Sequence, residues 1–170
     1  MENTPDVTKS TAKFLVDGML GSIARKLRIL GFDTIYDSES NDRQLLAMAR
    51  ETGRYLVTSD HELFISSKRL KVASILVTSR SEKSRLFEIF SKTKSTGIPK
   101  FPLASRCSVC NGELFESRMR EDQMQIYTCK NCGKDFWHGS HWKKLTVLFS
   151  EVQKMLENPA EGVNRLDSVQ

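Results

Sequence analysis

The sequence contains no long apolar segment. None of its apolar runs approaches the roughly 20 consecutive residues that a membrane-spanning helix needs, so we expect no part of the chain to lie inside a bilayer. The first dozen residues also lack the apolar stretch of a secretory signal peptide, and the sequence therefore predicts a cytoplasmic protein. We expect the polar ends, residues 1–12 and 158–170, to be disordered tails.

Cysteine is absent from most of the chain. All four cysteines lie between positions 107 and 132, whereas a disulfide-stapled secreted protein usually spreads them along its length. The remaining composition is that of a globular protein, with 39% hydrophobic and 28% charged residues. The formal net charge of +5 and the pI near 9.1 favour an acidic partner, of which nucleic acid is the commonest, although charge alone does not identify one.

Two Cys-x-x-Cys motifs hold the four cysteines. Cys107 and Cys110 form the first motif, and Cys129 and Cys132 form the second after eighteen intervening residues. This spacing predicts one structural Zn²⁺ bound by four thiolates in closed tetrahedral geometry. Free thiols or a redox Cys-x-x-Cys are the alternatives, and His138 or His141 is near enough in sequence to replace a cysteine.

The residues around these motifs complete a zinc ribbon over residues 106–142. Gly112 and Gly133 follow the two motifs, and we expect them to supply the positive φ that the turns require. Residues 113–118 and 123–128 are predicted to pair as a hairpin that brings the motifs together. Zinc binding contributes roughly 10–16 kcal/mol, which is enough to fold so small a module.

Apolar periodicity organises the first half of the chain. Strand-like runs at residues 14–16, 34–36, 54–58 and 73–77 alternate with helical patterns at residues 20–30, 41–53, 59–64 and 81–90. Asn41 and Gln44 fit a capping box at the start of the second helix. This order predicts an α/β domain at residues 13–91, with a mainly parallel sheet between helices. We expect a linker at residues 92–105 and a C-terminal helix at 143–157 that packs back on one of the domains.

Three aspartates fall where an open α/β sheet binds ligands. Asp17 ends the first strand, Asp60 follows the third, and Asp42 begins the helix after the second, so all belong at the carboxyl edge of the sheet. Two carboxylates about 4 Å apart repel each other by ~4 kcal/mol at an effective dielectric near 20, unless a cation lies between them. We therefore predict a Mg²⁺ or Mn²⁺ site, with Asp17 and Asp60 as direct ligands and Asp42 as a ligand or a holder of metal-bound water.

Such a site suits hydrolysis of a phosphodiester, because the metal polarises the phosphate and lowers the pKa of a bound water. Helix capping is the alternative role for Asp42 and Asp60, since both stand at helix starts. Asp33, Asp37 and Glu39 lie nearby and compete for a place at the same site.

Several of these landmarks resemble the Mut-seven C-terminal RNase domain family. They are the run FLVDGMLGSIARKLRILGFDT at residues 14–34, Asn41–Leu46, Thr58–Asp60 and Phe136–Trp142, and they span residues 13–145 in the family's order. The resemblance implies a PIN-like (Rossmann-like) sheet, a metal-dependent ribonuclease centre at Asp17, Asp42 and Asp60, and a C-terminal zinc ribbon. The chain departs from the family at Gly18, where a larger and often basic residue is usual, and at His138, where proline is common.

Basic and aromatic side chains offer contacts for RNA. Arg25 and Arg28 follow Asp17 on the first helix, and Trp137 and Trp142 lie among lysines near the ribbon. We expect the arginines to contact phosphates and the tryptophans to stack on unpaired bases. Solvated charge and packing of the tryptophans against the C-terminal helix are the structural alternatives.

The sequence thus predicts a metal-dependent RNA endonuclease whose ribbon grips RNA. The pairing of a PIN-like domain with a zinc ribbon suggests a precursor of rRNA or tRNA as the substrate. A non-catalytic RNA- or ribosome-binding adaptor with a degenerate acidic edge is the main alternative, and a protein-interaction module is another.

Overall fold

The computed structural model describes residues 12–93 and 105–159. The tails predicted at residues 1–12 and 158–170 and the linker predicted at 92–105 lie largely outside these residues.

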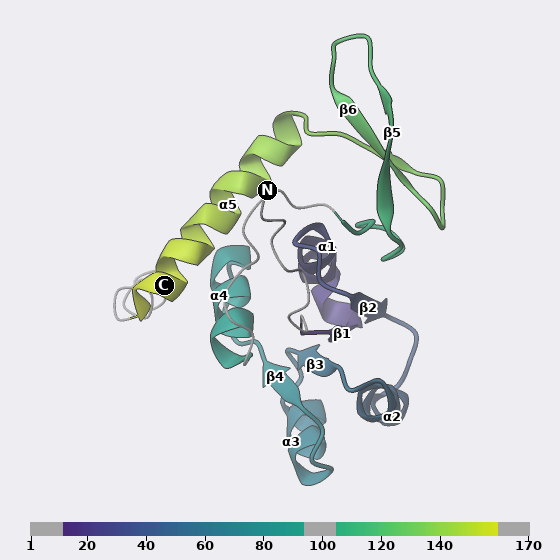
Figure 1. Ribbon diagram of the computed structural model, residues 1–170. Coiled ribbons are helices and arrows are strands. Elements are labelled where there is room, and N and C mark those ends of the chain that lie inside the picture. Colours follow the sequence, from purple (N-terminus) through teal and green to yellow (C-terminus); the bar gives the residue numbers. More distant parts are fainter. Residues whose placement is uncertain (1–11, 94–104, 160–170) are drawn as a thin grey trace, which may run out of the picture.

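Four parallel strands form the central sheet (Figure 1). In spatial order they are β2 (Thr34–Asp37), β1 (Phe14–Asp17), β3 (Tyr55–Thr58) and β4 (Ser74–Leu76). The two inner strands, β1 and β3, are almost fully buried, as expected for a parallel sheet covered on both faces. The predicted α/β fold with a parallel sheet is confirmed.

Helices cover both faces of this sheet. One face carries α1 (Gly21–Ile29), which follows the 3₁₀ turn η1 (Gly18–Leu20), and α4 (Glu82–Lys92); the other carries α2 (Asp42–Thr52) and α3 (His61–Arg69). Successive side chains of a strand point to opposite faces. Phe14 and Val16 therefore pack with α1 and α4, whereas Leu15 packs with α2 and α3.

Local sequence explains where these helices begin and end. Asn41 and Gln44 form the predicted capping box of α2, and Gly53 ends that helix with a φ of 63°. The end predicted for α3 at Phe64 was wrong, because the helix continues to Arg69. Its next buried position is a serine, Ser67, whose hydroxyl donates to the carbonyl oxygen of Phe64 at 2.6 Å, so apolar periodicity gave no sign of the last turns.

The second half of the chain forms a three-stranded antiparallel sheet and a long helix. The strands are β5 (Leu114–Met119), β6 (Gln125–Cys129) and β7 (Asp135–Phe136), and the first two are the expected hairpin. Helix α5 (Ser140–Glu157) begins three residues before the predicted start at 143. It runs back along α4, where Phe149 and Val152 join the larger core cluster (Figure 1).

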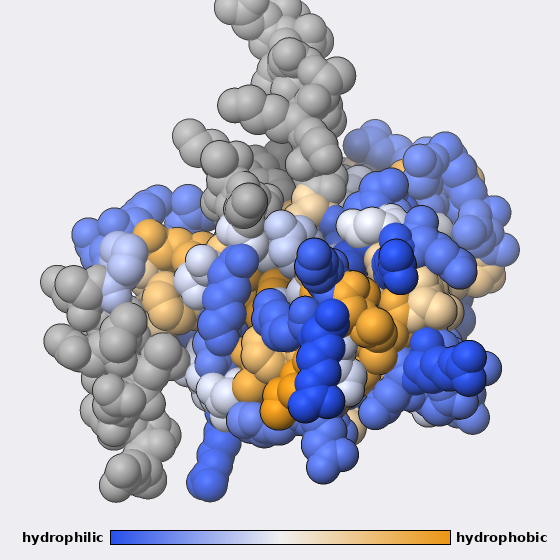
Figure 2. Space-filling model, turned by 90° about the horizontal axis from the view of Figure 1, so that it is seen from below, coloured by the Kyte–Doolittle hydropathy of each residue, from blue (hydrophilic) through white to orange (hydrophobic). Residues whose placement is uncertain are grey.

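The face below α3 carries both hydrophobic and hydrophilic residues. Figure 2 views the molecule from below, the end at which α3 lies in Figure 1, and shows hydrophobic residues gathered in the middle of this face with hydrophilic ones around them. Ile65 and Leu70, in and directly after α3, are about half exposed.

Among residues 12–93 and 105–159, none of the helices has the length and hydropathy that crossing a bilayer would need.

Candidate functional site

The four cysteines meet at one point of the ribbon. Their Sγ atoms all lie within 4.8 Å of one another, with 3.7 Å between Cys107 and Cys132 and 3.4 Å between Cys110 and Cys129. A tetrahedral zinc with Zn–S bonds of about 2.3 Å places its sulfurs roughly 3.8 Å apart. Both the donor atoms and their spacing therefore fit a Zn²⁺ ion.

The two Cys-x-x-Cys turns have matching backbones. The N–H of Asn111 donates to Cys107 O at 2.9 Å, and the N–H of Gly133 donates to Cys129 O at 3.0 Å. Both donors have a positive φ, 67° at Asn111 and 69° at Gly133. The sequence had assigned the first positive φ to Gly112, and this was wrong because asparagine also tolerates the left-handed region. Gly112 is required for space, since a Cβ there would lie 2.9 Å from Cys129 Sγ.

Burial raises the pKa of the cysteine thiols, whereas hydrogen bonds from backbone N–H groups lower it. Burial raises the pKa of Cys107 to about 12, so this thiol needs a bound cation in order to ionise at neutral pH. Burial acts in the same sense at Cys129, but the N–H groups of Cys132 and Asn131 outweigh it and lower the pKa of Cys129 to about 7. Of these two thiols, Cys129 is therefore the one that ionises more readily.

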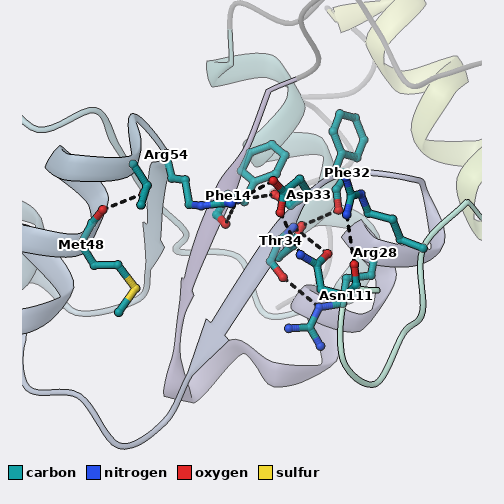
Figure 3. Close-up of polar contacts among 10 residues, drawn as sticks. Phe14, Arg28, Phe32, Asp33, Thr34, Met48, Arg54 and Asn111 are labelled. Atoms are coloured by element: carbon teal, nitrogen blue, oxygen red, sulfur yellow. Dashed lines mark hydrogen bonds and ion pairs between the residues drawn. The ribbon is translucent and has the colours of Figure 1, made fainter. Parts of the chain in front are cut away.

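The first turn of the ribbon is fastened to the sheet through Asn111. Its Oδ1 accepts a hydrogen bond from Thr34 N at 3.0 Å, and its Nδ2 donates to Asp33 Oδ1 at 2.8 Å (Figure 3). The other oxygen of Asp33 forms an ion pair with Arg54 at 2.8 Å. Burial alone would raise the pKa of Asp33, but the hydrogen bonds from Arg54 and Asn111 and the charge of Arg54 hold it below its usual value.

Acidic side chains line the carboxyl edge of the sheet. Asp17 and Asp37 are in-register neighbours on β1 and β2, so their side chains lie side by side. Asp17 Oδ2 accepts a hydrogen bond of 2.7 Å from Thr58 Oγ1, and that hydroxyl oxygen accepts one of 2.9 Å from Asp60 N. Thr58 therefore links the acid of the first strand to the acid that follows the third.

The ligand atoms of the three predicted aspartates do not all lie within 4.8 Å of one another. Asp60 Oδ1 caps α3 by accepting from the N–H groups of Glu62 and Leu63 at 2.7 and 3.1 Å. Asp42 is the exposed first residue of α2. Within the described part of the chain, the four cysteines are the only set of three or more His, Cys, Asp or Glu residues whose ligand atoms lie within 4.8 Å of one another.

A cleft lies between α1, the ribbon and α5. Its volume is about 470 Å³, and three of the residues predicted to bind RNA line it: Arg25, Trp137 and Trp142. The sheet separates α1 from the layer of α2 and α3, toward which Asp17 projects with Leu15. The cleft and the acidic side chains therefore lie in different layers of the molecule.

The family model of the Mut7-C RNAse domain matches residues 12–149, which include the sheet, the ribbon and the first part of α5. The chain belongs to this family. Membership gives the protein a ribonuclease-related role with RNA as its class of substrate. Neither a curated protein nor a solved structure matched the chain.

Arg28 of this Mut7-C RNAse domain has a structural role in place of the predicted RNA contact. The residue is 7% exposed, and its Nε donates to Thr34 O at 2.9 Å. Its Nη1 donates to Val109 O at 2.8 Å and Ser108 O at 3.3 Å. The prediction failed because the guanidinium is used to dock the ribbon, a contact between residues about eighty positions apart that no local pattern indicates.

Gly18 lies in a closely packed turn at the end of β1. A Cβ at this position would lie 3.0 Å from the Cα of Ser38, so the segment after β2 fits closely against the turn. The carbonyl oxygen of Gly18 accepts a hydrogen bond from the Tyr36 hydroxyl at 2.8 Å. In this Mut7-C RNAse domain, the absence of a side chain at Gly18 thus leaves room for the backbone of Ser38.

Asp37 is the acidic residue that sequence reasoning placed only among the competitors. Hydrogen bonds from the hydroxyl and N–H of Ser40 and from the N–H of Glu39 lower its pKa, so the carboxyl is ionised at neutral pH. Its position beside Asp17 follows from the register of β1 and β2. A single sequence does not reveal strand register. The one available sign was that Asp17 and Asp37 each directly follow a predicted strand.

Proposed function

We propose that this protein is a metal-dependent endonuclease that hydrolyses RNA phosphodiester bonds at the carboxyl edge of its sheet. One observation carries the proposal. In a chain of a ribonuclease family, Thr58 binds the carboxylate of Asp17 and the N–H of Asp60, and Asp17 pairs in register with Asp37 on the neighbouring strand. The ribbon binds a structural Zn²⁺ and takes no part in the chemistry.

The acidic edge suits Mg²⁺ or Mn²⁺. These ions take carboxylate oxygens, and Mg²⁺ keeps most of its waters and uses one or two carboxylates, so three converging aspartates are not required. None of Asp17, Asp42 and Asp60 forms an ion pair with a described Lys, Arg or His side chain, which leaves their charge for a cation. Asp17 and Asp60 would hold the ion directly, with Asp42 or Asp37 binding its water.

The chemistry divides between the ion and the chain. A bound ion would polarise the scissile phosphate and make an attacking water more acidic. Thr58 donates to one oxygen of Asp17 and so keeps its other oxygen turned to the edge. Asp60 retains Oδ2 for the site while Oδ1 caps α3. The substrate is a structured RNA precursor, of rRNA or tRNA, and the cytoplasm is the compartment in which the zinc thiolates stay reduced.

The test is cleavage of structured RNA with and without Mn²⁺. The wild type should cut only with the ion, and Asp17→Asn should cut at least about 100-fold more slowly, as when a group that stabilises the transition state is removed. Asp122→Asn, in the turn of the ribbon hairpin, is the matched control and should cut normally. Normal cleavage by Asp17→Asn would overturn the assignment of the active site.

A non-catalytic RNA-binding adaptor is the second candidate. It is favoured by the capping role of Asp60, whose Oδ1 is already bonded to the start of α3. An adaptor would bind RNA as tightly after Asp17→Asn as before and would cut with neither ion.

A further inference from the structure

The cleft between α1, the ribbon and α5 has the composition of a nucleotide-binding site. Its volume of about 470 Å³ is within the range of roughly 300–1,000 Å³ found for small-molecule pockets. Its lining includes three cationic side chains and no aspartate or glutamate. Aromatic side chains from the ribbon and α5 make up much of its wall, namely Tyr127, Phe136, Trp137 and Trp142.

The aromatic wall is held rigidly. The ring of His138 stacks on that of Trp142, with centroids 4.1 Å apart and planes 19° apart. On its other contact, the centroid of His138 lies 5.3 Å from that of the Tyr127 ring. His138 Nε2 is buried and has no hydrogen-bond partner among the described residues, a condition that native proteins rarely keep without a reason. Burial lowers the pKa of His138, which keeps the ring neutral at neutral pH.

Trp137 provides the exposed surface for stacking. It is 47% exposed, and the guanidinium carbon of Arg120 lies 5.0 Å from its ring centroid. A large aromatic residue left this open beside a cationic group suits stacking on an unpaired base.

The cations of the cleft differ in how free they are. Lys26 forms an ion pair of 2.7 Å with Glu82, and Arg106 donates to Asn111 O at 3.0 Å. Arg25 is exposed and makes no hydrogen bond or ion pair within residues 12–93 and 105–159, so its charge is available to a phosphate. The aromatic side chains offer faces on which bases can stack, and the free guanidinium offers a contact for a phosphate, so the two together suit a nucleotide.

From these observations we propose that the cleft binds an unpaired nucleotide of single-stranded RNA, with the base on Trp137 and Trp142 and its phosphate on Arg25 and Arg106. This inference rests on the proposed function, because it takes the bound RNA to be the substrate of the nuclease. Helix α1, nine residues and about 13 Å long, begins beside the acidic edge and runs along the cleft, so one strand can reach both sites. The cleft thus holds RNA away from the bond that is cut.

Binding is measured by fluorescence anisotropy with a labelled single-stranded oligouridine, using the zinc-loaded full chain with Asp17→Asn to prevent cutting. Trp137→Ala should weaken binding roughly 5- to 150-fold, the usual effect of losing one base–aromatic stack. Phe115→Ala is the matched control, because Phe115 is 43% exposed on the ribbon and lies outside the cleft. Equal affinity of Trp137→Ala and the Asp17→Asn parent would overturn the proposal, as would an equal loss with Phe115→Ala.

Intrinsic fluorescence gives a second readout. The chain has two tryptophans and both line the cleft, so stacking of a base should quench the emission of the protein. Arg25→Gln should lower the slope of log affinity against log salt by about 1, whereas Arg50→Gln on the exposed side of α2 should not. RNA binding without a change in tryptophan emission would place the RNA elsewhere.

Failure of the cleft and failure of the nuclease are separable. If the wild type binds oligouridine with tryptophan quenching but cuts no RNA, the proposed cleft is supported and the proposed nuclease activity is rejected. If the wild type cuts RNA and Trp137→Ala binds oligouridine normally, the nuclease activity is supported and the proposed cleft is rejected. Absence of oligouridine binding by the parent protein would also reject the cleft and leave a protein ligand as its occupant.

Discussion

The hydroxyl of Thr58 donates to Asp17 Oδ2 at 2.7 Å while it accepts from the N–H of Asp60 at 2.9 Å. Thr58 is fully buried, and its two hydrogen bonds are partly buried. This single side chain therefore fixes the carboxylate of β1 relative to the segment that follows β3. The position of Asp17, and not only its charge, depends on it.

Thr58→Val should damage both stability and cleavage. It keeps the shape of the side chain but leaves Asp60 N without its partner, and bonds to charged groups contribute about 1.5–3 kcal/mol each. We expect a loss of about 1–3 kcal/mol in the free energy of unfolding, measured with urea, and slower cleavage at saturating RNA. Thr58→Ser keeps the hydroxyl and should retain most of both; a Val variant as active as wild type would show that Asp17 needs no positioning.

Arg28 and Arg25, less than one helical turn apart, should behave in opposite ways. Arg28→Gln leaves the carbonyl oxygens of Thr34 and Val109 without their donor, so we expect a loss of about 1–3 kcal/mol of stability. Arg25→Gln should leave stability within about 0.5 kcal/mol of wild type, because the side chain is exposed. Urea denaturation and RNA binding, measured on both variants, check the contrast, and an unchanged stability of Arg28→Gln would contradict the docking role.

The Asp33 carboxylate should make stability depend on pH in the acid range. Its pKa is lowered in the folded protein, so its contribution is complete above the unfolded value of about 3.9 and disappears as the pH falls through the folded value. Below about pH 4 the wild type should therefore lose stability more steeply than Asp33→Asn. Comparing the two proteins cancels the acid sensitivity of the zinc thiolates. Parallel pH profiles would remove Asp33 as a source of stability.

Removal of zinc should unfold the ribbon and spare the parallel sheet. A bound zinc contributes roughly 10–16 kcal/mol to such modules, and β5 to β7 bury too few side chains to replace it. Hydrogen exchange after chelation should rise in residues 106–140 and stay slow in β1 and β3, and added zinc should reverse the change. Helix α5 should remain protected, since Phe149 and Val152 are packed in the core. If elemental analysis finds no zinc in the native protein, the assignment of the ribbon fails.

Much of the fold could be predicted because its signals are local. The capping box at Asn41 and Gln44, the alternation of strand and helix patterns, and the two Cys-x-x-Cys motifs each involve residues a few positions apart. Each acts through one turn or one face, so a single sequence contains the whole signal.

The errors concern contacts between distant segments. The role of Arg28 depends on how the first Cys-x-x-Cys turn packs against α1, and the place of Asp37 depends on strand register. The positive φ at Asn111 accompanies a side chain that bonds to the sheet, which explains an asparagine where the second turn has Gly133. The predicted convergence of Asp17, Asp42 and Asp60 assumed that residues at one edge of a sheet meet at one point, but their ligand atoms do not all lie within 4.8 Å of one another.

Asn111 joins the zinc turn to β2 through its amide and to the ribbon through its own backbone. These bonds, with those of Arg28, oppose movement of the ribbon relative to the sheet and so constrain the span between the aromatic cleft and the acidic edge. If one RNA strand occupies both sites, this distance would determine how many nucleotides lie between the base bound in the cleft and the phosphodiester bond that is cut. The nucleotide sequence between them would not matter.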